Sequence, residues 1–505
     1  MDCGMRLLSR SAVGKQAGQG TCEGHPYYIR WRGCMVGVPL AGTLCALLCV
    51  VGMLFMLVIV ALPGPAAYAR VKASDWATFL ESNARDGYNK KETIINPKSA
   101  PNLKLHWKNT AAGAINAQPI EANGMVYWGS WDGLEHGSRL SDGKDVWTAN
   151  LGQTQGDCIH SPRGVLSTAT VVSEKIGGKS TPVVFVGGGD VQLYALNANT
   201  GTVIWKTRLG TQPSYFLYSA TAVFNGSVYI GVSSLGDCPL IQGQVVQVNA
   251  QTGAIQHTFN VVPSGCIGGS VWGSPSIDTK MKILYFATGN PGTCGQSEPM
   301  TDAVVALNAK DLSLVGSWQV PPSQQVNDGD FGGTPTLFKA TINGTVRQMA
   351  GVINKNGIYY AFDRTNISAG PLWEDQLAAP ISQNGLGNNI SSSAWDGSTL
   401  YAAAAKTTIN GMSCSGSIRA INPADGSYKW QVCLLHNVLD PVTAVPGLVV
   451  LGSSTNIFIF DAKTGKQLFS FSDTNKNSNF WGSASISSGV LYQGNADGIL
   501  YAFGT

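Results

Sequence analysis

The chain has 505 residues, of which 12% are charged and 61 are glycine. The charged share is about half of the roughly 25% found in globular proteins, and glycine is nearly twice as frequent as its usual share of about 7%. This composition favours short strands joined by tight turns over charged amphipathic helices. The net charge of +3, with no long basic run, does not support a nucleic-acid partner.

The N-terminal region divides into a short cytoplasmic tail (1–34), a transmembrane anchor or signal segment (35–62) and a linker (63–74). No charged residue lies between Cys34 and Arg70, and this apolar stretch is about long enough to cross a bilayer. Basic residues outnumber acidic ones upstream, which predicts that the tail is cytoplasmic and the remainder extracytoplasmic. Because Ala67-Tyr68-Ala69 also fits a cleavage site, an anchored form and a secreted form both remain open.

A structural repeat is expected to fill residues 75–505. Its clearest copy runs through residues 183–187, 193–197 and 203–205, as three apolar stretches separated by polar turns that include Asn199-Thr200-Gly201. Short apolar strands bounded by Gly and Asn turns predict an antiparallel meander. Repeats of this kind are typical of β-propellers.

An aromatic anchor near the end of each repeat counts the blades. Where the turn glycine is present, the anchor follows it four residues later, as in Gly201 and Trp205. Such a side chain is expected to pack between neighbouring blades. The anchors number eight, which predicts an eight-bladed β-propeller of the all-β class: Trp107, Trp147, Trp205, His257, Trp318, Trp373, Trp430 and Phe469.

The two ends of the repeat region are expected to complete one blade. Residues 489–494 and 499–503 supply two strands and the chain then stops, whereas residues 103–107 form an aromatic strand with no preceding partners. Joining them would close the ring and remove its exposed edges.

Six cysteines fall in the repeat region and suit an exported protein. They allow fifteen pairings, and sequence alone does not choose among them. Proximity in the repeat scheme favours Cys266 with Cys294, Cys414 with Cys433, and Cys158 with Cys238.

Several loop segments carry chemistry-bearing residues in a fixed order: 157–164, 230–237, 269–275, 288–291 and 352–363. With these segments the chain resembles the PQQ-dependent quinoprotein alcohol dehydrogenases (PQQ is pyrroloquinoline quinone). It is most similar to the polyvinyl alcohol dehydrogenase-like branch, over about residues 75–505. The resemblance implies an eight-bladed propeller with PQQ and calcium as cofactors. The repeat itself is shared with non-enzymatic propellers, including an outer-membrane assembly lipoprotein, so it indicates fold and not activity.

The resemblance assigns five residues to the cofactor. It implies that Arg163 binds a carboxylate of PQQ, that Trp272 forms the floor under the ring system, and that Lys355 contacts the quinone oxygens. It also places Ser219 and Ser233 among the cofactor-binding residues.

The resemblance implies a calcium ion held by Asn290 and by Asp237, which stands where the family has a glutamate. A carboxylate should take the proton of the substrate hydroxyl. Asp302 and Asp330 are the candidates for this base, with Asp328 as a further alternative.

Two departures from the family pattern weaken the enzymatic interpretation. Asp157 replaces the first of two adjacent cysteines, so the disulfide that covers the quinone in the family is absent, and Ser297 stands near the place of the family's catalytic aspartate. Each site residue also has an ordinary structural interpretation. Arg163 would pair with a loop carboxylate, and Asn290 would serve the turn that it begins with Pro291.

The leading hypothesis is an extracytoplasmic PQQ-dependent dehydrogenase that oxidises a small-molecule or polymeric alcohol. Because the sequence has no Cys-x-x-Cys-His haem motif, electrons would pass to a separate acceptor such as a cytochrome or a membrane quinone. The main alternative is a non-catalytic propeller that serves as a binding or assembly scaffold at the cell envelope. A hydrolase has little support because no nucleophile motif stands out.

Overall fold

The computed structural model describes residue 72 and residues 74–505, apart from 158, 382–387 and 476. These residues fall within one compact unit that spans 67–505. The predicted cytoplasmic tail and the predicted transmembrane or signal segment lie outside the described residues. In the described part, no helix has the length and apolarity needed to span a membrane.

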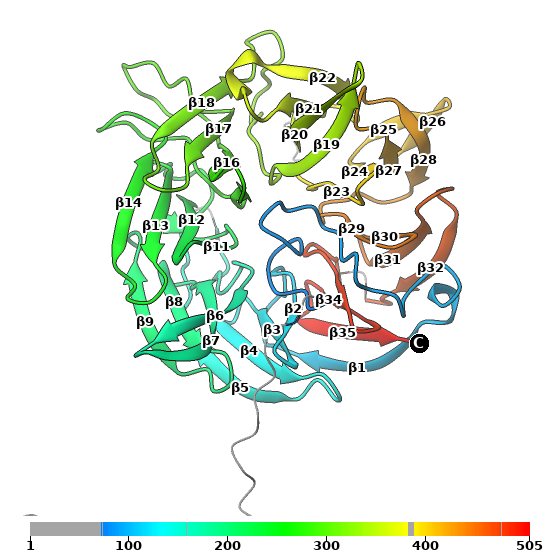
Figure 1. Ribbon diagram of the computed structural model, residues 1–505, viewed down its shortest axis with the longest axis horizontal. Coiled ribbons are helices and arrows are strands. Elements are labelled where there is room, and N and C mark those ends of the chain that lie inside the picture. Colours follow the sequence, from blue (N-terminus) through cyan, green and yellow to red (C-terminus); the bar gives the residue numbers. More distant parts are fainter. Residues whose placement is uncertain (1–71, 73, 158, 382–387, 476) are drawn as a thin grey trace, which may run out of the picture. The chain divides into compact units, whose positions relative to one another are not determined.

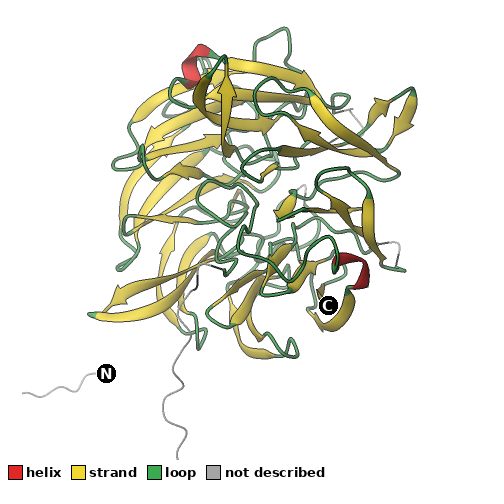
Figure 2. Ribbon diagram, turned by 45° about the vertical axis from the view of Figure 1, so that its right-hand side comes forward, coloured by secondary structure: helices red, strands yellow, loops and turns green. Residues whose placement is uncertain are grey.

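Eight antiparallel sheets are arranged radially as the blades of a propeller (Figure 1), which confirms the predicted fold class. Helical structure in the described residues is confined to two single-turn 3-10 helices, η1 (Ala100–Asn102) and η2 (Ile367–Ala369) (Figure 2). Strands are given below from the innermost to the outermost of each blade.

Blade 1 contains β2 (Ile120–Ala122), β3 (Met125–Gly129), β4 (Leu134–Arg139) and β5 (Asp145–Asn150), and blade 2 contains β6 (Thr170–Ile176), β7 (Lys179–Gly187), β8 (Gln192–Asn197) and β9 (Val203–Arg208). Blade 3 contains β11 (Ala222–Phe224), β12 (Ser227–Ser234), β13 (Gln244–Asn249) and β14 (Ile255–Asn260), with the short β10 (Tyr215–Phe216) also paired to β12. Blade 4 contains β15 (Ser276–Asp278), β16 (Ile283–Ala287), β17 (Ala303–Asn308) and β18 (Leu314–Gln319).

Blade 5 contains β19 (Thr336–Ile342), β20 (Thr345–Ile353), β21 (Ile358–Asp363) and β22 (Pro371–Gln376). Blade 6 contains β23 (Ala394–Trp395), β24 (Leu400–Ala404), β27 (Gly416–Ile421) and β28 (Tyr428–Leu434), and carries the hairpin β25 (Thr407–Ile409) and β26 (Met412–Cys414). Blade 7 contains β29 (Thr443–Val445), β30 (Leu448–Ser453), β31 (Asn456–Asp461) and β32 (Gln467–Ser472), and blade 8 contains β33 (Ser485–Ser487), β34 (Val490–Gly494), β35 (Ile499–Gly504) and β1 (Lys104–Thr110).

The ring closes as predicted, because β1 from the start of the repeat region pairs with β35 at its end (Figure 1). The strand that bears Trp107 thereby becomes the outer strand of blade 8. Closure of this kind leaves no incomplete blade where the two ends of the repeat region meet.

The tryptophan anchors pack on the turn glycine of the next blade. A Cβ added at Gly201, where φ is +69°, would lie 2.5 Å from the Trp147 ring, so only glycine leaves room for the indole. The same indole donates a hydrogen bond of 2.9 Å to the Ala198 carbonyl of blade 2. The geometry recurs at Trp107, Trp205, Trp373 and Trp430.

His257 does not serve as an anchor, so that part of the prediction was wrong. Its side chain is exposed, and Phe259 two residues later packs against Phe286 of blade 4. In blade 4, Leu312 stands at the turn position that glycine takes in most other blades, and its buried side chain fills the interblade space that an indole would need.

A segment that precedes β1 crosses the centre of the ring (Figure 1) and contacts the innermost strand of every blade. Within this central segment (residues 75–89), hydrogen bonds or bridges run to the inner strands in the order of the blades. Arg85 is fully buried in it and donates to the carbonyls of Phe79, Thr221 and Pro275. The central segment was assigned to the propeller from sequence, but its role as a plug was not foreseen.

Two of the three expected disulfides are present, Cys266–Cys294 and Cys414–Cys433. The third expected pair includes Cys158, which lies outside the described residues.

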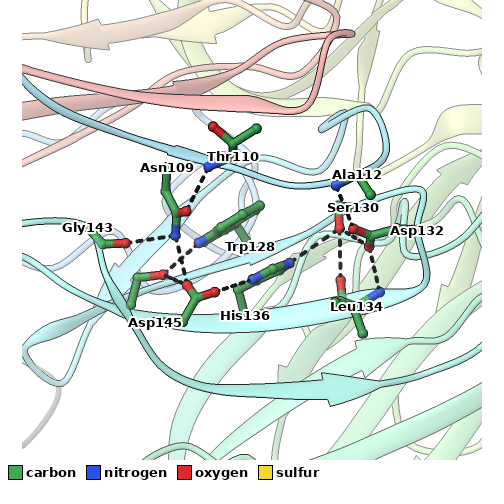
Figure 3. A network of polar contacts seen from close by, with 11 residues as sticks. Asn109, Thr110, Ala112, Trp128, Ser130, Asp132, Leu134, His136, Gly143 and Asp145 are labelled. Carbon is green, nitrogen blue, oxygen red and sulfur yellow. Dashed lines mark hydrogen bonds and ion pairs between the residues drawn. The ribbon is translucent and has the colours of Figure 1, made fainter.

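A polar network ties three strands of blade 1 together (Figure 3). Asp145 accepts hydrogen bonds from the His136 ring (2.9 Å), from Ser138 (2.7 Å) and from Asn109 of β1 (2.9 Å). The His136 ring stacks on Trp128 with a centroid distance of 3.7 Å. Burial raises the pKa of Asp145, but the hydrogen bonds from His136 and Ser138 outweigh it and hold the pKa below its usual value.

We expect Asp145→Asn to lower the free energy of unfolding by about 1–3 kcal/mol, because it leaves buried donors without a charged acceptor. Urea denaturation of the purified propeller measures the change. Asp142→Asn is the matched control, since that carboxylate lies in an exposed pair with Arg139 and its loss should leave the midpoint unchanged. Equal midpoints for Asp145→Asn and the wild type would show that the network contributes no stability.

Glu135 is a buried carboxyl group between blades 1 and 2. Glu135 lies directly opposite Gly129 on the neighbouring strand, so the two residues are on the same face of the sheet. On this face Gly129 lies against Val165, which precedes the first strand of blade 2. Neither carboxyl oxygen has a hydrogen-bond partner among the described residues, and burial raises the pKa of Glu135 well above its usual value.

A raised pKa in the folded state means that stability is lost as the pH rises above the unfolded-state pKa of about 4.5. We therefore expect Glu135→Gln to stabilise the protein more at about pH 8 than at about pH 5. Thermal unfolding across that range tests the expectation. Parallel pH profiles for the wild type and the variant would contradict it.

Candidate functional site

A cavity of about 590 Å³ lies at the centre of the ring. It is lined by loops that precede the innermost strand or follow the second strand of each blade. Every blade contributes, with Trp131, Arg163, Asp237, Trp272, Lys355, Ile390, Leu439 and Trp481 as examples from blades 1 to 8 in order. Phe79 of the central segment also lines the cavity, so this segment forms the floor of the cavity within the channel.

Asp330 and Lys355 form a buried ion pair in the wall made by blade 5. The Lys355 Nζ lies 2.5 Å from Asp330 Oδ1 and 2.8 Å from Asp328 Oδ1. Asp330 Oδ2 accepts a hydrogen bond of 2.8 Å from the Trp272 indole, whose ring lies 5.3 Å from Lys355 Nζ. The two oxygens of Asp330 thus fix the ammonium group and the indole that line the cavity.

Burial and pairing act in opposite directions on these groups. Burial raises the pKa of Asp330, and the Lys355 ammonium only partly opposes it. Burial lowers the pKa of Lys355, but the carboxylates of Asp330 and Asp328 outweigh this and leave it above its usual value. Lys355 is therefore held as a cation inside the cavity wall.

Asn290 joins two carboxylates from different blades. Its Nδ2 donates to Asp237 Oδ2 and to Asp328 Oδ1, each at 2.9 Å. Rotation of the amide by half a turn would present the Asn290 oxygen at the same place, because its oxygen and nitrogen are nearly isosteric. Two carboxylates and an amide oxygen are ligands that calcium prefers. The described residues therefore fit a hard cation at this point.

Arg163 enters the cavity from blade 2. Its guanidinium carbon lies 3.7 Å from the centre of the Trp131 ring, and its backbone is held by paired hydrogen bonds to Thr154. Among the described residues, no carboxylate lies within ion-pair distance of Arg163, so the structural interpretation as a loop ion pair was wrong. Burial lowers the pKa of Arg163, and a nearby anion would relieve that cost.

Most of the residues predicted from sequence meet at this cavity. Arg163, Trp272, Lys355, Asp237 and Asp330 line it, and Ser233 lines it while donating to the Phe216 carbonyl. Asn290 reaches the same group through its bonds to Asp237 and Asp328. Their proposed chemical roles remain predictions.

Asp302 and Ser219 do not line the cavity. The Ser219 hydroxyl is fully buried and accepts a hydrogen bond from the Gly231 amide. Asp302 is buried in the loop before β17, and burial, reinforced by Asp330, raises its pKa to about 7. The Asp302 carboxyl group is therefore buried beside the cavity and does not line the surface at which a substrate would bind.

Two aromatic residues of the cavity were missed. Trp481 begins a Trp-Gly-Ser sequence just before the innermost strand of blade 8, as Trp272 does before the innermost strand of blade 4. Trp131 lies two residues after the end of β3, just as Lys355 lies two residues after the end of β20. Alignment of the repeats against one another would have found both.

Comparison with known proteins agrees with this architecture. The family described as "Glucose/ethanol/alcohol dehydrogenase, beta-propeller domain" matches residues 76–374. A second family, "Outer membrane protein assembly factor BamB", matches residues 354–504. The solved quinohemoprotein alcohol dehydrogenase from Comamonas testosteroni shares the fold with a TM-score of 0.69 and 18% identity, over 85% of this chain and 80% of that one.

Two curated relatives are similar in sequence. A polyvinylalcohol dehydrogenase from Sphingopyxis sp. (strain 113P3) is 23% identical over 77% of this chain and 65% of its own length. Quinohemoprotein alcohol dehydrogenase ADH IIB from Pseudomonas putida is 28% identical over 54% of this chain and 43% of its own length. The chain therefore aligns with less than two thirds of either relative. Since the first family covers more than half of the chain, the protein belongs to the glucose/ethanol/alcohol dehydrogenase β-propeller family.

Proposed function

We propose that this protein is a PQQ-dependent dehydrogenase that oxidises an alcohol outside the cytoplasm and passes the electrons to a separate acceptor. One observation carries the proposal: an arginine without a carboxylate partner among the described residues, an indole face, a buried lysine and an oxygen-rich group converge on one cavity from blades 2 to 5. This set provides an anion site, a stacking surface and a cation site within one enclosed space.

Each residue has a definite task in this proposal. Arg163 binds a cofactor carboxylate, Trp272 supports the flat ring system, and Lys355 donates to its oxygens. Asp237 and Asn290 hold calcium. PQQ, when bound, supplies the quinone that accepts hydride from the substrate carbon.

Asp328 is the best-placed base among the three aspartates considered. Both oxygens of Asp330 are engaged by Lys355 and Trp272, and Asp302 lies behind the wall. Asp328 lines the cavity with 44% of its side chain exposed, and in the described structure no hydrogen bond reaches its Oδ2. Asp328 Oδ2 would take the hydroxyl proton as the C–H electron pair leaves with the hydride, which converts the alcohol carbon to a carbonyl.

A scaffold role is the second candidate, and a specific observation favours it. Residues 354–504 match the assembly-factor family, and Asp157 stands where the dehydrogenases have a cysteine beside Cys158. This alternative requires no cofactor in the cavity.

The first test is cofactor uptake. We expect the purified propeller to bind PQQ in the presence of Ca²⁺, measured by equilibrium dialysis and by the absorption spectrum of the bound quinone. Arg163→Ala should weaken binding by about 10- to 100-fold, because a charge-assisted hydrogen bond is worth about 1.5–3 kcal/mol. La³⁺ is the second cation tested, since two carboxylates, those of Asp237 and Asp328, lie against Asn290. Failure of PQQ to bind with either cation would leave the scaffold interpretation.

The second test concerns the base. Asp328→Asn should lower kcat for dye-coupled alcohol oxidation by about 10²- to 10⁴-fold, as expected for loss of a general base. PQQ uptake, measured separately, reports whether the variant still holds its cofactor. Asp311→Asn, at an exposed turn of blade 4, is the control and should keep wild-type activity. An unchanged kcat for Asp328→Asn would assign the proton to another group.

A further inference from the structure

The cavity has two chemically different walls. The charged group of Asp237, Asp328, Asp330 and Lys355 comes from blades 3 and 5. Across the axis from blades 3 and 4, blades 7 and 8 supply Leu439, Pro441 and Trp481, whereas Ile390 of blade 6 lies beside Gly332 of blade 5. Since the blades follow one another around a ring of eight, blade 8 faces blade 4 and blade 1 faces blade 5.

The difference between the two walls is clearest at residues that occupy the same position in different blades. Trp481 of blade 8 stands where blade 4 has Trp272, and Trp131 of blade 1 stands where blade 5 has Lys355. The same backbone geometry thus places a buried cation on one side of the cavity and an indole on the other. After each of these two tryptophans a glycine lies close to the backbone of the next blade: a Cβ would be 3.0 Å from the Gly333 carbonyl oxygen at Gly273 and 2.5 Å from the Asn116 carbonyl oxygen at Gly482.

The aromatic side is rigidly built. The rings of Trp131 and Trp481 stack with a centroid distance of 6.1 Å, and the Arg163 guanidinium carbon lies 3.7 Å from the centre of the Trp131 ring. The turn that carries Trp131 is fixed by Asp132, which accepts hydrogen bonds from Ser130, from the Leu134 amide and from the Ala112 amide (Figure 3). The stack therefore presents a fixed surface to a ligand.

Ser483 supplies a second sign of a ligand beside Trp481. It lines the cavity with 1% of its surface exposed, and its hydroxyl has no hydrogen-bond partner among the described residues. Its repeat equivalent, Ser274, accepts a hydrogen bond from the Ala220 amide. A buried hydroxyl without a partner is costly, and one polar atom of a ligand or a water molecule would satisfy it.

We propose that blades 7 and 8 form the substrate wall and that it selects alcohols with a large apolar body, such as an aromatic ring or a long alkyl chain. This inference rests on the proposed function, because the hydroxyl must reach Asp328 opposite. Leu439 and Pro441 offer no side-chain hydrogen bond, whereas a sugar or small polyol needs several polar partners to replace its water. An apolar group gains instead by leaving water against Trp481.

The experiment compares benzyl alcohol and 1-octanol with ethanol and glycerol. For the wild type, kcat/KM should be higher for the two apolar alcohols. Trp481→Ala should lower kcat/KM for benzyl alcohol by about 10- to 100-fold, the range for a lost apolar contact of one group, and should change the value for ethanol by less than about 3-fold. Trp481→Phe, which keeps a flat apolar side chain, should recover most of the loss.

A binding measurement separates this inference from the proposed function. Calorimetric titration of benzyl alcohol into the purified protein, with and without PQQ, should show binding that Trp481→Ala weakens. If PQQ is not taken up but benzyl alcohol still binds at Trp481, the dehydrogenase proposal fails and the apolar wall stands. An equal loss on all four alcohols, or a preference for glycerol, would overturn the apolar wall.

Discussion

The contact between an indole of one blade and the turn glycine of the next is the interaction on which the structure depends. It occurs at Gly143, Gly201, Gly253, Gly426 and Gly465, each with a positive φ that glycine tolerates. The indole buries a large apolar surface and ends in a hydrogen bond to the neighbouring backbone, so it fixes the angle between blades. Once eight blades are set at that angle, their innermost strands surround a channel that they cannot fill themselves.

The chain fills that channel from the inside with its own central segment. Because residues 75–89 bond to the innermost strand of every blade, the segment depends on the closed ring and the ring is braced by the segment. Arg85 shows how completely this part is enclosed, since burial lowers its pKa to about 9 even though four hydrogen bonds satisfy its donors. What remains open is the cavity on the loop side, where the candidate site lies.

The ion pairs of this cavity lie within blade 5, and neutral side chains from a neighbouring blade complete the hydrogen bonds of its carboxylates. Asp330 would be costly alone at 5% exposure, and it is retained because Lys355 and Trp272 satisfy its two oxygens. Asn290 donates to one oxygen of Asp237 and to one oxygen of Asp328. Arg163 is the exception, since its guanidinium stacks on Trp131 without an acid partner among the described residues, and an anionic ligand would complete it. The electrostatics thus point to a ligand that carries negative charge on one side and accepts hydrogen bonds on the other.

The number of blades and the closure of the ring by β1 and β35 could be read from the chain before folding, because both follow from local turn chemistry that repeats along it. The two disulfides were only favoured by proximity in the repeat scheme. The family resemblance carried by the loop segments also named several cavity residues, among them Arg163, Trp272 and Lys355. Only the tertiary structure decided which aspartate faces the cavity: Asp302 and Asp328 look alike in sequence, but a buried loop holds one behind the wall and leaves the other exposed. The same holds for His257, whose place is taken by Leu312 of the next blade, and for the central segment, whose partners lie on all eight blades. Such contacts join residues far apart in sequence, and no local pattern records them.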